Sequence, residues 1–575
     1  MQNPCVRICK WVLFVPIIAT ALFGFLTYSF AVPPAQQVRP RLAVLVVFDQ
    51  MRADYLTRWQ SLFGDGGIRR LQTEGAWFQN CNYPYADTVT ATGHASMLTG
   101  CSPDRHGIIG NEWYDREAGA EVSCVASDRY RRVPPAGANA TGKKSAKEGA
   151  SPERLLAPTV GDVLKEATGG RARVVSLSFK DRSAVLPAGR HPDACYWFSG
   201  STAEAITSTY YRDRIHSWVA DFNRAHQVDQ WFHKEWTRLR PELDYAHFSG
   251  PDDVAGEGNG SGQGRTFPHP FGAADKSKPT SSYYGALYNS PFANEVLLNL
   301  VERAIDAEHL GTQDTPDLLC VSFSSNDAIG HCYGPDSQEV LDVTLRSDLI
   351  VRDLLNYLDA KVGKGCYVLA LTADHGVCPL PEVVRAQGKD AGRIIPSAWP
   401  KQANAFLKET FARKEDKSNW IEAFSPPWIY LNKQVLRKQG LKEEEVERAL
   451  ANWLVKQPGI QSAYTRTQLL GELPKDDAVG RTVQRSFYPA RSGEVAGVMK
   501  PYFFMWGTMT GTTHGSPHPY DTHVPLLVYG PGIEGGARDE AVTPQAIAAI
   551  FAHSLGIPKP AMAEAPLPAT LQMAH

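Results

Sequence analysis

The chain has 575 residues, 43% of them hydrophobic, which suffices for one large core with insertions or for two to three domains. Its 59 Lys and Arg residues nearly balance 61 Asp and Glu residues, for a formal net charge of -2. This balance excludes a global electrostatic footprint for nucleic acid, so no nucleic acid is expected as a specific partner and any phosphate-binding site must be local.

The first residues carry a targeting signal. Arg7 and Lys10 precede an apolar run from Trp11 to about Leu26, and the small residues around Ala31 offer a cleavage point. We interpret residues 1–31 as a signal peptide that directs the protein to the periplasm or out of the cell. The alternative is an uncleaved anchor, because the run approaches the length that spans a bilayer. Only in that case would the protein associate with a membrane.

The number of cysteines agrees with export to the periplasm or out of the cell. Cleavage would leave eight cysteines, namely Cys81, Cys101, Cys124, Cys195, Cys320, Cys332, Cys366 and Cys378. An even number of cysteines in an oxidising compartment predicts disulfides, although the sequence leaves their pairing open.

Four apolar runs have the composition of strands that are buried on both faces of a parallel sheet. They cover residues 42–48, 318–323, 367–372 and 525–529. Helical segments such as 337–358 and 543–555 lie between them, so we predict an α/β fold with a largely parallel central sheet and helices on both faces.

Polar residues recur where these strands stop. The first run ends in Asp49, the second leads into Asp327, and the third leads into Asp374 and His375. Ligands gather at the carboxyl ends of parallel strands. We therefore expect these side chains to meet in one crevice despite their separation in the sequence.

The chain beyond residue 40 is predicted to be one catalytic domain, 40–575, with two insertions. Residues 190–290 form the first and include a stretch rich in glycine, 249–264, which we interpret as a surface loop. Residues 385–500 form the second, an inserted cap with a charged helical segment at 441–455.

Acidic and histidine side chains after the strands suit a metal site. Asp327 and His331 lie four residues apart on one short loop, where a carboxylate and an imidazole can bind one zinc ion. Asp374 and His375 are adjacent and can diverge toward two metals, since Gly376 permits a tight turn. With Asp49 and the glycine-flanked His514, the set reaches three Asp and three His, roughly the inventory for two zinc ions.

The segment 87–100 contains the candidate nucleophile. Thr90 precedes His94 by four residues, and Thr99-Gly100 follows. This pattern resembles the nucleophile motif of the alkaline phosphatase superfamily, in which a Thr or Ser opens a short turn and helix. The candidate metal ligands follow in the order of that superfamily, and the implied set is Asp49, Thr90, Asp327, His331, Asp374, His375 and His514. The resemblance spans most of the mature chain.

Within the superfamily, the chain is most similar to the phosphate-irrepressible (PafA-like) bacterial alkaline phosphatases, relatives of the nucleotide pyrophosphatase/phosphodiesterases. Asn111 lies in a segment resembling the one whose Asn hydrogen-bonds a phosphoryl oxygen. Lys180 and Arg182 resemble the Lys-x-Arg pair of the monoesterase branch, and would share a face of an extended segment. The resemblance implies two Zn²⁺ ions and a covalent phosphothreonine.

Two other residues compete for these roles. Cys101-Ser-Pro-Asp-Arg105 fits the signature of sulfatases, but their cysteine lies nine residues before the Leu-Thr-Gly, a register that here falls on Thr90. Cys101 then becomes a disulfide or buried thiol. His523 rivals His514 as the last ligand, and we prefer His514 because its Thr-His-Gly setting matches the family better.

The chemistry favours an alkaline phosphatase that hydrolyses small-molecule phosphate monoesters. Cationic Lys180 and Arg182 suit the extra non-bridging charge of a monoester, and Asn111 adds a neutral donor. The alternative is a phosphodiesterase or nucleotide pyrophosphatase of the same superfamily, which usually lacks the Lys-x-Arg pair. A non-catalytic phosphate-binding protein is a third hypothesis, and the complete metal set with Thr90 argues against it.

Overall fold

A computed structural model describes residues 39–135, 149–272, 276–413 and 416–572. The predicted signal peptide lies outside the described residues. The chain divides into two units, Met1–Gln37 and Val38–His575, and the described residues belong to the second. No helix in its described part is long and apolar enough to cross a membrane.

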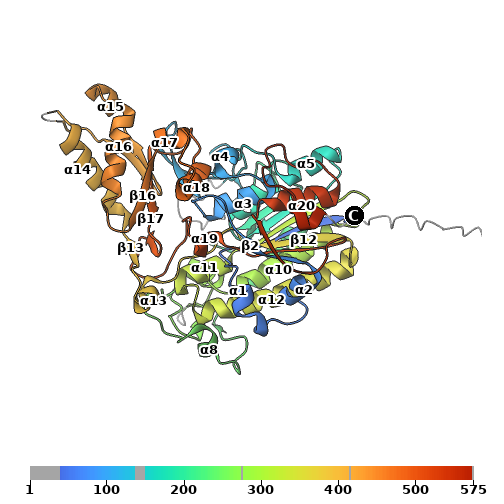
Figure 1. The fold of residues 1–575 in the computed structure, drawn as a ribbon. Helices are drawn as coiled ribbons and strands as arrows, with labels where there is room; N and C mark the ends of the chain where they lie inside the picture. The colour runs from blue at the N-terminus through green and yellow to red at the C-terminus, as the bar shows by residue number, and fades with distance from the viewer. Residues whose placement is uncertain (1–38, 136–148, 273–275, 414–415, 573–575) are drawn as a thin grey trace, which may run out of the picture. The chain divides into compact units, whose positions relative to one another are not determined.

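A ten-stranded sheet forms the centre of the fold, in the order β20-β2-β19-β12-β1-β11-β6-β7-β8-β5 (Figure 1). Its middle strands are β12 (Tyr367–Thr372), β1 (Leu42–Phe48), β11 (Asp317–Phe323), β6 (Val174–Ser178) and β7 (Ala194–Phe198), and all five run parallel. Every residue of β1 is buried, which agrees with its uninterrupted apolar sequence. The predicted α/β fold is confirmed.

Strand β19 (Leu526–Tyr529) runs against its neighbours. It pairs antiparallel with β12, where Leu526 lies opposite Thr372, and also with β2 (Ala76–Cys81). The fourth apolar run is therefore an antiparallel strand within a largely parallel sheet. Its beginning lies at the edge where the parallel strands end, so the segment preceding β19, which includes His514, reaches the carboxyl ends of the parallel strands.

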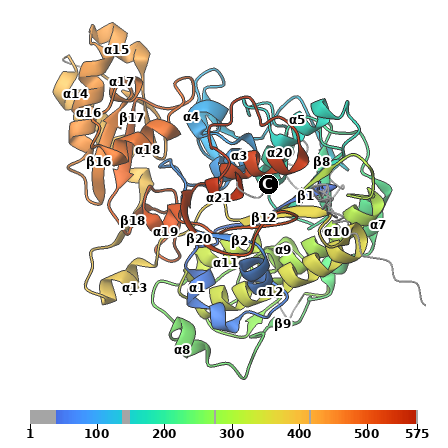
Figure 2. The same ribbon diagram turned by 45° about the vertical axis from the view of Figure 1, so that its right-hand side comes forward.

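Helices cover both faces of the sheet (Figures 1 and 2). On one face lie α3 (Thr90–Thr99), α5 (Val160–Ala167) and α20 (Ala546–Leu555), and on the other lie α2 (Ile68–Glu74), α10 (Phe292–Ala307) and α12 (Gln338–Leu358). The Ser337 side chain accepts a hydrogen bond from the Val340 N–H, which fixes the start of α12 where the sequence predicts it. One continuous apolar core fills the space between these layers and the sheet.

The segment predicted as a cap contains its own sheet, in the order β14-β15-β17-β16. Its elements are α14 (Trp399–Phe411), β14 (Ile421–Ser425), β15 (Trp428–Leu431), α15 (Lys433–Gln439), α16 (Glu443–Leu454), β16 (Ile460–Thr465) and β17 (Val495–Met499). A separate apolar cluster packs these helices on the sheet, and Trp428 on β15 joins Trp113 in a second cluster that links the segment to the nucleophile region. The boundaries 385–500 and 190–290 stay predictions, and β7 and β8 (Ala205–Ser208) of the central sheet fall inside the latter.

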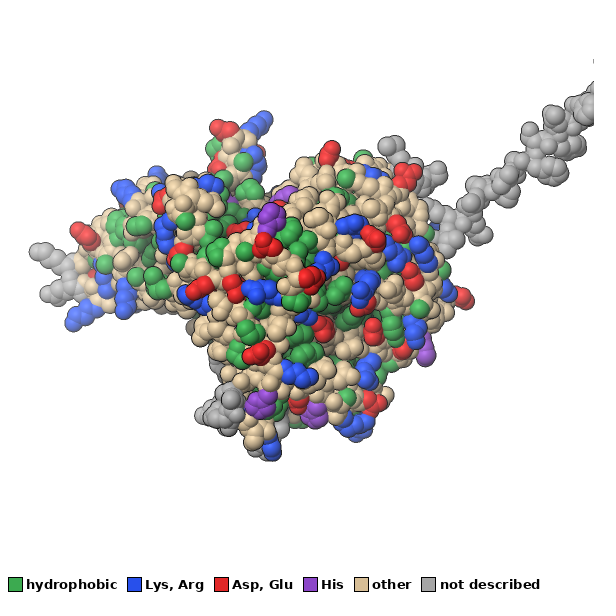
Figure 3. Space-filling model, turned by 90° about the horizontal axis from the view of Figure 1, so that it is seen from below, with side chains coloured by type: hydrophobic (Ala, Val, Ile, Leu, Met, Phe, Trp, Pro, Cys, Tyr) green, Lys and Arg blue, Asp and Glu red, His purple; other side chains and the backbone are tan. Residues whose placement is uncertain are grey.

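The surface agrees with the near-neutral composition. Figure 3 shows basic and acidic side chains interspersed over the face in view, with hydrophobic side chains between them. The eight described cysteines are free thiols, so the structure does not support the predicted disulfides within the residues that it describes.

Candidate metal centre and nucleophile

Three neighbouring parallel strands deliver the acidic residues to one edge of the sheet. Asp49 follows β1, Asp327 lies in helix α11 (Ser325–Tyr333) directly after β11, and Asp374 follows β12. All three carboxylates are buried, with exposed fractions of 5% or less. The predicted crevice thus forms where adjacent strands end.

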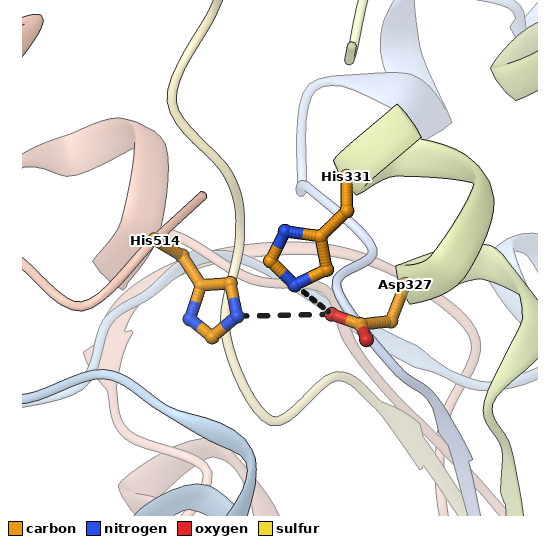
Figure 4. A group of neighbouring side chains, drawn as sticks. All are labelled: Asp327, His331 and His514. Carbon is orange, nitrogen blue, oxygen red and sulfur yellow. Dashed lines mark ion pairs between the residues drawn. The ribbon is translucent and has the colours of Figure 1, made fainter. Parts of the chain in front are cut away.

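The Asp327–His331 pair lies on a helix and not, as predicted, on a loop. Residues four apart share one helix face, which brings His331 Nε2 to 3.2 Å from Asp327 Oδ1. His514 Nε2 approaches the same oxygen to 3.7 Å from the segment before β19 (Figure 4). These three side chains form the first candidate metal group.

The three histidines are oriented through their other ring nitrogen. His331 Nδ1 lies 2.7 Å from the Thr512 carbonyl, His514 Nδ1 lies 2.8 Å from that of Thr88, and His375 Nδ1 lies 2.9 Å from that of Gly376. A carbonyl oxygen only accepts, so each Nδ1 must carry the proton. Each Nε2 then presents a lone pair toward the carboxylates, as metal-binding histidines do.

The second candidate group consists of Asp49, Asp327 and His375. His375 Nε2 lies 3.5 Å from Asp49 Oδ1 and 3.5 Å from Asp374 Oδ2. Asp49 Oδ1 is buried and accepts no hydrogen bond from a described residue, whereas Asp374 Oδ2 lies 3.2 Å from His94 Nδ1. Because a buried oxygen without a donor is costly, this group fits a bound cation.

The pKa shifts of the carboxylates also indicate a site that binds cations. Burial and the nearby Asp374 charge raise the pKa of Asp49. Burial acts to raise the pKa of Asp327 too, but His331 and Lys180 outweigh it and hold that pKa well below its usual value. Three close buried carboxylates repel one another, and Lys180 offsets only part of that charge.

Lys180 lies between the two groups. Its Nζ is 2.7 Å from Asp49 Oδ2, 2.6 Å from Asp327 Oδ2, and donates to Thr90 Oγ1 at 3.3 Å. Burial acts to lower the pKa of Lys180, but the carboxylates of Asp327 and Asp49 outweigh it and raise that pKa above its usual value. The ammonium therefore stays charged. The side chain therefore reaches the candidate nucleophile as a cation.

Arg182 is placed differently from the prediction of an extended Lys-x-Arg segment. Lys180 is the N-cap of helix α6 (Asp181–Ala188), and Arg182 belongs to its first turn. The guanidinium lies 3.8 Å from Asp181 Oδ1, and its Nε is buried without a hydrogen-bond partner among the described residues. A free donor in this position is available to a ligand.

Thr90 is the first residue of α3, and its hydroxyl lies 3.4 Å from His375 Nε2. Asn111 Oδ1 accepts the Ala91 N–H at 2.8 Å, which orients the Asn111 amide beside the helix N-terminus. Gly93 is required because a Cβ there would collide with the Asp374 carbonyl. Helix N-termini favour anionic groups, so this corner suits a phosphoryl group.

Comparison with known proteins agrees with this geometry. The profile of the type I phosphodiesterase / nucleotide pyrophosphatase family matches residues 43–517. The chain belongs to this family. Alkaline phosphatase PafA of Elizabethkingia meningoseptica is 35% identical over 532 residues, which cover 92% of this chain and 93% of the relative. Alkaline phosphatase PhoV of Synechococcus elongatus is 32% identical over 533 residues, 92% of each chain.

Solved structures extend the agreement to the fold. The crystal structure of PafA superposes with a TM-score of 0.84 at 34% identity and covers 93% of this chain and 99% of that one. The resemblance to PafA-like members of the phosphodiesterase / nucleotide pyrophosphatase family, expected from the motifs, is confirmed.

The structure does not support the two residues that competed for roles in the site, His523 as a metal ligand and Cys101 as the nucleophile. His523 Nε2 lies 2.8 Å from the Gln79 carbonyl, at the end of β2, outside both candidate metal groups. Cys101 is buried, and burial raises the pKa of its thiol to about 11. A thiol with so high a pKa is a poor nucleophile at neutral pH.

Gln50 is a site residue that the sequence analysis missed. Its backbone N–H donates to Asp374 Oδ1 at 3.1 Å, and its Nε2 donates to Asp327 Oδ1 at 2.7 Å. It therefore links Asp327, which both candidate metal groups share, to Asp374, from a left-handed conformation with φ of 68°. Such strain in a residue other than glycine marks functional sites, and no sequence pattern announces it.

Replacing Gln50 with alanine is expected to weaken metal binding by about 10- to 100-fold, since Asp327 loses the side-chain amide that orients it, while the backbone N–H still donates to Asp374. Titration of the metal-free protein with zinc measures this loss directly. Gln50→Gly is the matched variant, because it removes the same amide while relieving the backbone strain. Unchanged affinity in both variants would show that Gln50 is only a structural residue.

Proposed function

We propose that this protein is an alkaline phosphatase that hydrolyses phosphate monoesters through a phosphothreonine at Thr90. The relatives PafA and PhoV, both named alkaline phosphatases, support the reaction class. The observation that carries the proposal is the Thr90 hydroxyl, which lies 3.4 Å from His375 Nε2 and 3.3 Å from Lys180 Nζ at the start of a helix.

Two zinc ions are the proposed cofactors. Asp327, His331 and His514 would hold one ion. Asp49 and His375 of the other candidate group would hold the second, together with Thr90 and Asp374 from the ligand set that the resemblance implies. Histidine nitrogens and carboxylates are the ligands that zinc prefers. Bound metal lowers the pKa of a hydroxyl group and stabilises the charge on a leaving oxygen.

The side chains of this protein would carry out the remaining steps. The Thr90 oxygen forms a bond to phosphorus while the bond from phosphorus to the leaving oxygen breaks, and water later cleaves the phosphothreonine. Lys180 and Arg182 would neutralise the non-bridging oxygens, and Asn111 would donate one further hydrogen bond. The helix N-terminus at Thr90 adds to the same stabilisation.

A crystal structure of a PafA variant supports the choice of these residues. That variant carries replacements of a threonine, an asparagine, a lysine and an arginine. Thr90, Asn111, Lys180 and Arg182 are the same residue types in the same chain order, with the same spacing from threonine to asparagine and from lysine to arginine.

We place the enzyme in the periplasm or outside the cell, because residues 1–31 have the charge and apolar pattern of a signal peptide. Its substrates would be small-molecule phosphate monoesters. Phosphodiester hydrolysis is the second candidate activity, and the name of the matching family favours it. The buried ammonium of Lys180 favours the monoester, which carries one more negative charge.

With zinc bound, the purified protein is expected to hydrolyse p-nitrophenyl phosphate at least about tenfold faster than bis-p-nitrophenyl phosphate at alkaline pH. The two substrates share a leaving group, so the comparison isolates the charge of the phosphoryl group. Release of p-nitrophenolate measures both rates. The reverse ranking would replace the monoesterase proposal with a phosphodiesterase.

A further inference from the structure

A cavity of about 240 Å³ borders the candidate metal centre. Its walls come from β15 and β17 of the cap, from β18 (Phe503–Met505), and from the segment that carries His514. These walls include the aromatic side chains Trp428, Phe503, Phe504, Trp506 and Tyr520. No lysine or arginine of the described chain lines it.

The cavity adjoins the first candidate metal group. His514 lines it directly, and Trp506 stacks on His331 with ring centroids 5.3 Å apart and planes 8° from parallel. Thr90 lies instead beside His375. Because phosphoryl transfer is in line, a substrate attacked by Thr90 would release its leaving oxygen on the side opposite Thr90, toward the group of His331 and His514, whose side chains Figure 4 draws.

Asp87 supplies an unpaired acidic group to this cavity. Its side chain lines the cavity, the residue is 5% exposed, and no described residue donates a hydrogen bond to its carboxylate. The carboxylate lies against Gly110 and Gly515, where a Cβ would come within 3.5 Å and 3.6 Å of its oxygens. These glycines adjoin Asn111 and His514, so Asp87 lies close to the reaction centre.

A buried carboxylate without a partner lowers the stability of the folded protein. Burial raises the pKa of Asp87 to about 8, since a buried negative charge without a partner is unfavourable. Asp521 of α19 (Pro519–Thr522) also lines the cavity; its Oδ2 accepts from the Ser516 N–H at 3.0 Å, and its Oδ1 accepts no hydrogen bond from the described residues. Two buried carboxylates among aromatic rings favour a cation.

We propose that this cavity receives the leaving group of the phosphate monoester and selects leaving groups that carry a compact organic cation. Asp87 provides the opposing charge, and the aromatic walls, above all Trp506, provide the faces on which alkylated ammonium groups bind. The proposal rests on the phosphatase activity proposed above. A neutral aromatic leaving group is the competing occupant.

The first test compares choline phosphate with 3,3-dimethylbutyl phosphate, its uncharged isostere, at a pH above the pKa of Asp87. We expect the native enzyme to prefer choline phosphate by roughly tenfold or more in kcat/KM. Asp87→Asn keeps the shape of the side chain and is expected to abolish the preference. Asp65→Asn, at an ion-paired and exposed position, is the matched control and should retain it. A preference that is absent, or equal in native and Asp87→Asn enzymes, overturns the proposal.

The second test does not require turnover. Calorimetry measures binding of choline chloride and of 3,3-dimethylbutan-1-ol to the zinc-loaded protein at matched ionic strength. We expect choline to bind about tenfold more tightly, and Asp87→Asn and Trp506→Ala each to remove that difference. Equal binding of the two alcohols overturns the cation site. If choline binds selectively but no monoester is hydrolysed, the proposed function fails while the cation site stands.

Discussion

Replacing Thr90 with alanine is expected to lower kcat for phosphate monoesters by at least about 10³- to 10⁴-fold, because the variant has no oxygen to form the covalent bond. Zinc content should remain near that of the native protein. Asp49, Asp374 and His375 remain in place, and the three residues of the other candidate group are untouched. Steady-state rates and metal analysis of the same preparation measure the two quantities.

Two further variants make this result specific. Thr90→Ser keeps a hydroxyl in the same position and should recover much of the activity, whereas Thr73→Ala, at an exposed helical position, should not change it. Acid quenching during turnover should leave phosphate on the peptide that contains Thr90. Native rates in Thr90→Ala would eliminate the phosphothreonine and require water to attack the substrate directly.

The central strands could be predicted from the sequence because a strand that is buried on both faces is an unbroken run of apolar residues. β1 and β12 begin and end at the predicted residues, since each is an unbroken apolar run that a polar residue terminates. The convergence of Asp49, Asp327 and Asp374 follows from the same pattern, because parallel neighbours end at one edge. These features depend on local composition and on a general rule of sheet architecture.

The direction of β19 could not be predicted from local sequence. More than 150 residues, including the cap, separate it from β12, and its apolar run reads the same in either direction. The helix at Asp327–His331 also escaped prediction. It begins directly after β11 with a polar first turn and contains Gly330, so it lacks the apolar periodicity that identifies longer helices.

Tertiary contacts determine the rest of the candidate site. Nothing in the sequence places Lys180 Nζ between the carboxylates of Asp49 and Asp327, and nothing indicates that Gln50 bridges Asp327 and Asp374. The burial of the unpaired Asp87 carboxylate could not be predicted from the sequence either, because it depends on how the chain folds around that residue. Such conflicts between local stability and position are typical of functional sites.

Substituting alanine for both Lys180 and Arg182 is expected to lower kcat/KM for a phosphate monoester by about 10²- to 10³-fold or more. A diester with the same leaving group should lose less than about tenfold, because it carries one negative charge fewer for the two cations to stabilise. Lys364→Ala removes an exposed lysine as a matched control.

Lys180 also neutralises Asp49 and Asp327, so the double variant could lose rate by losing metal. Zinc content therefore has to be measured with the rates, and Lys180→Arg tests whether charge alone at this position restores metal binding. With metal retained, equal losses on monoester and diester would contradict a role in recognising the phosphoryl charge. A larger loss on the monoester than on the diester would show that two side chains at the start of α6 give this enzyme its preference for monoesters. These are Lys180, which lies beside Thr90, and Arg182, whose Nε has no hydrogen-bond partner among the described residues.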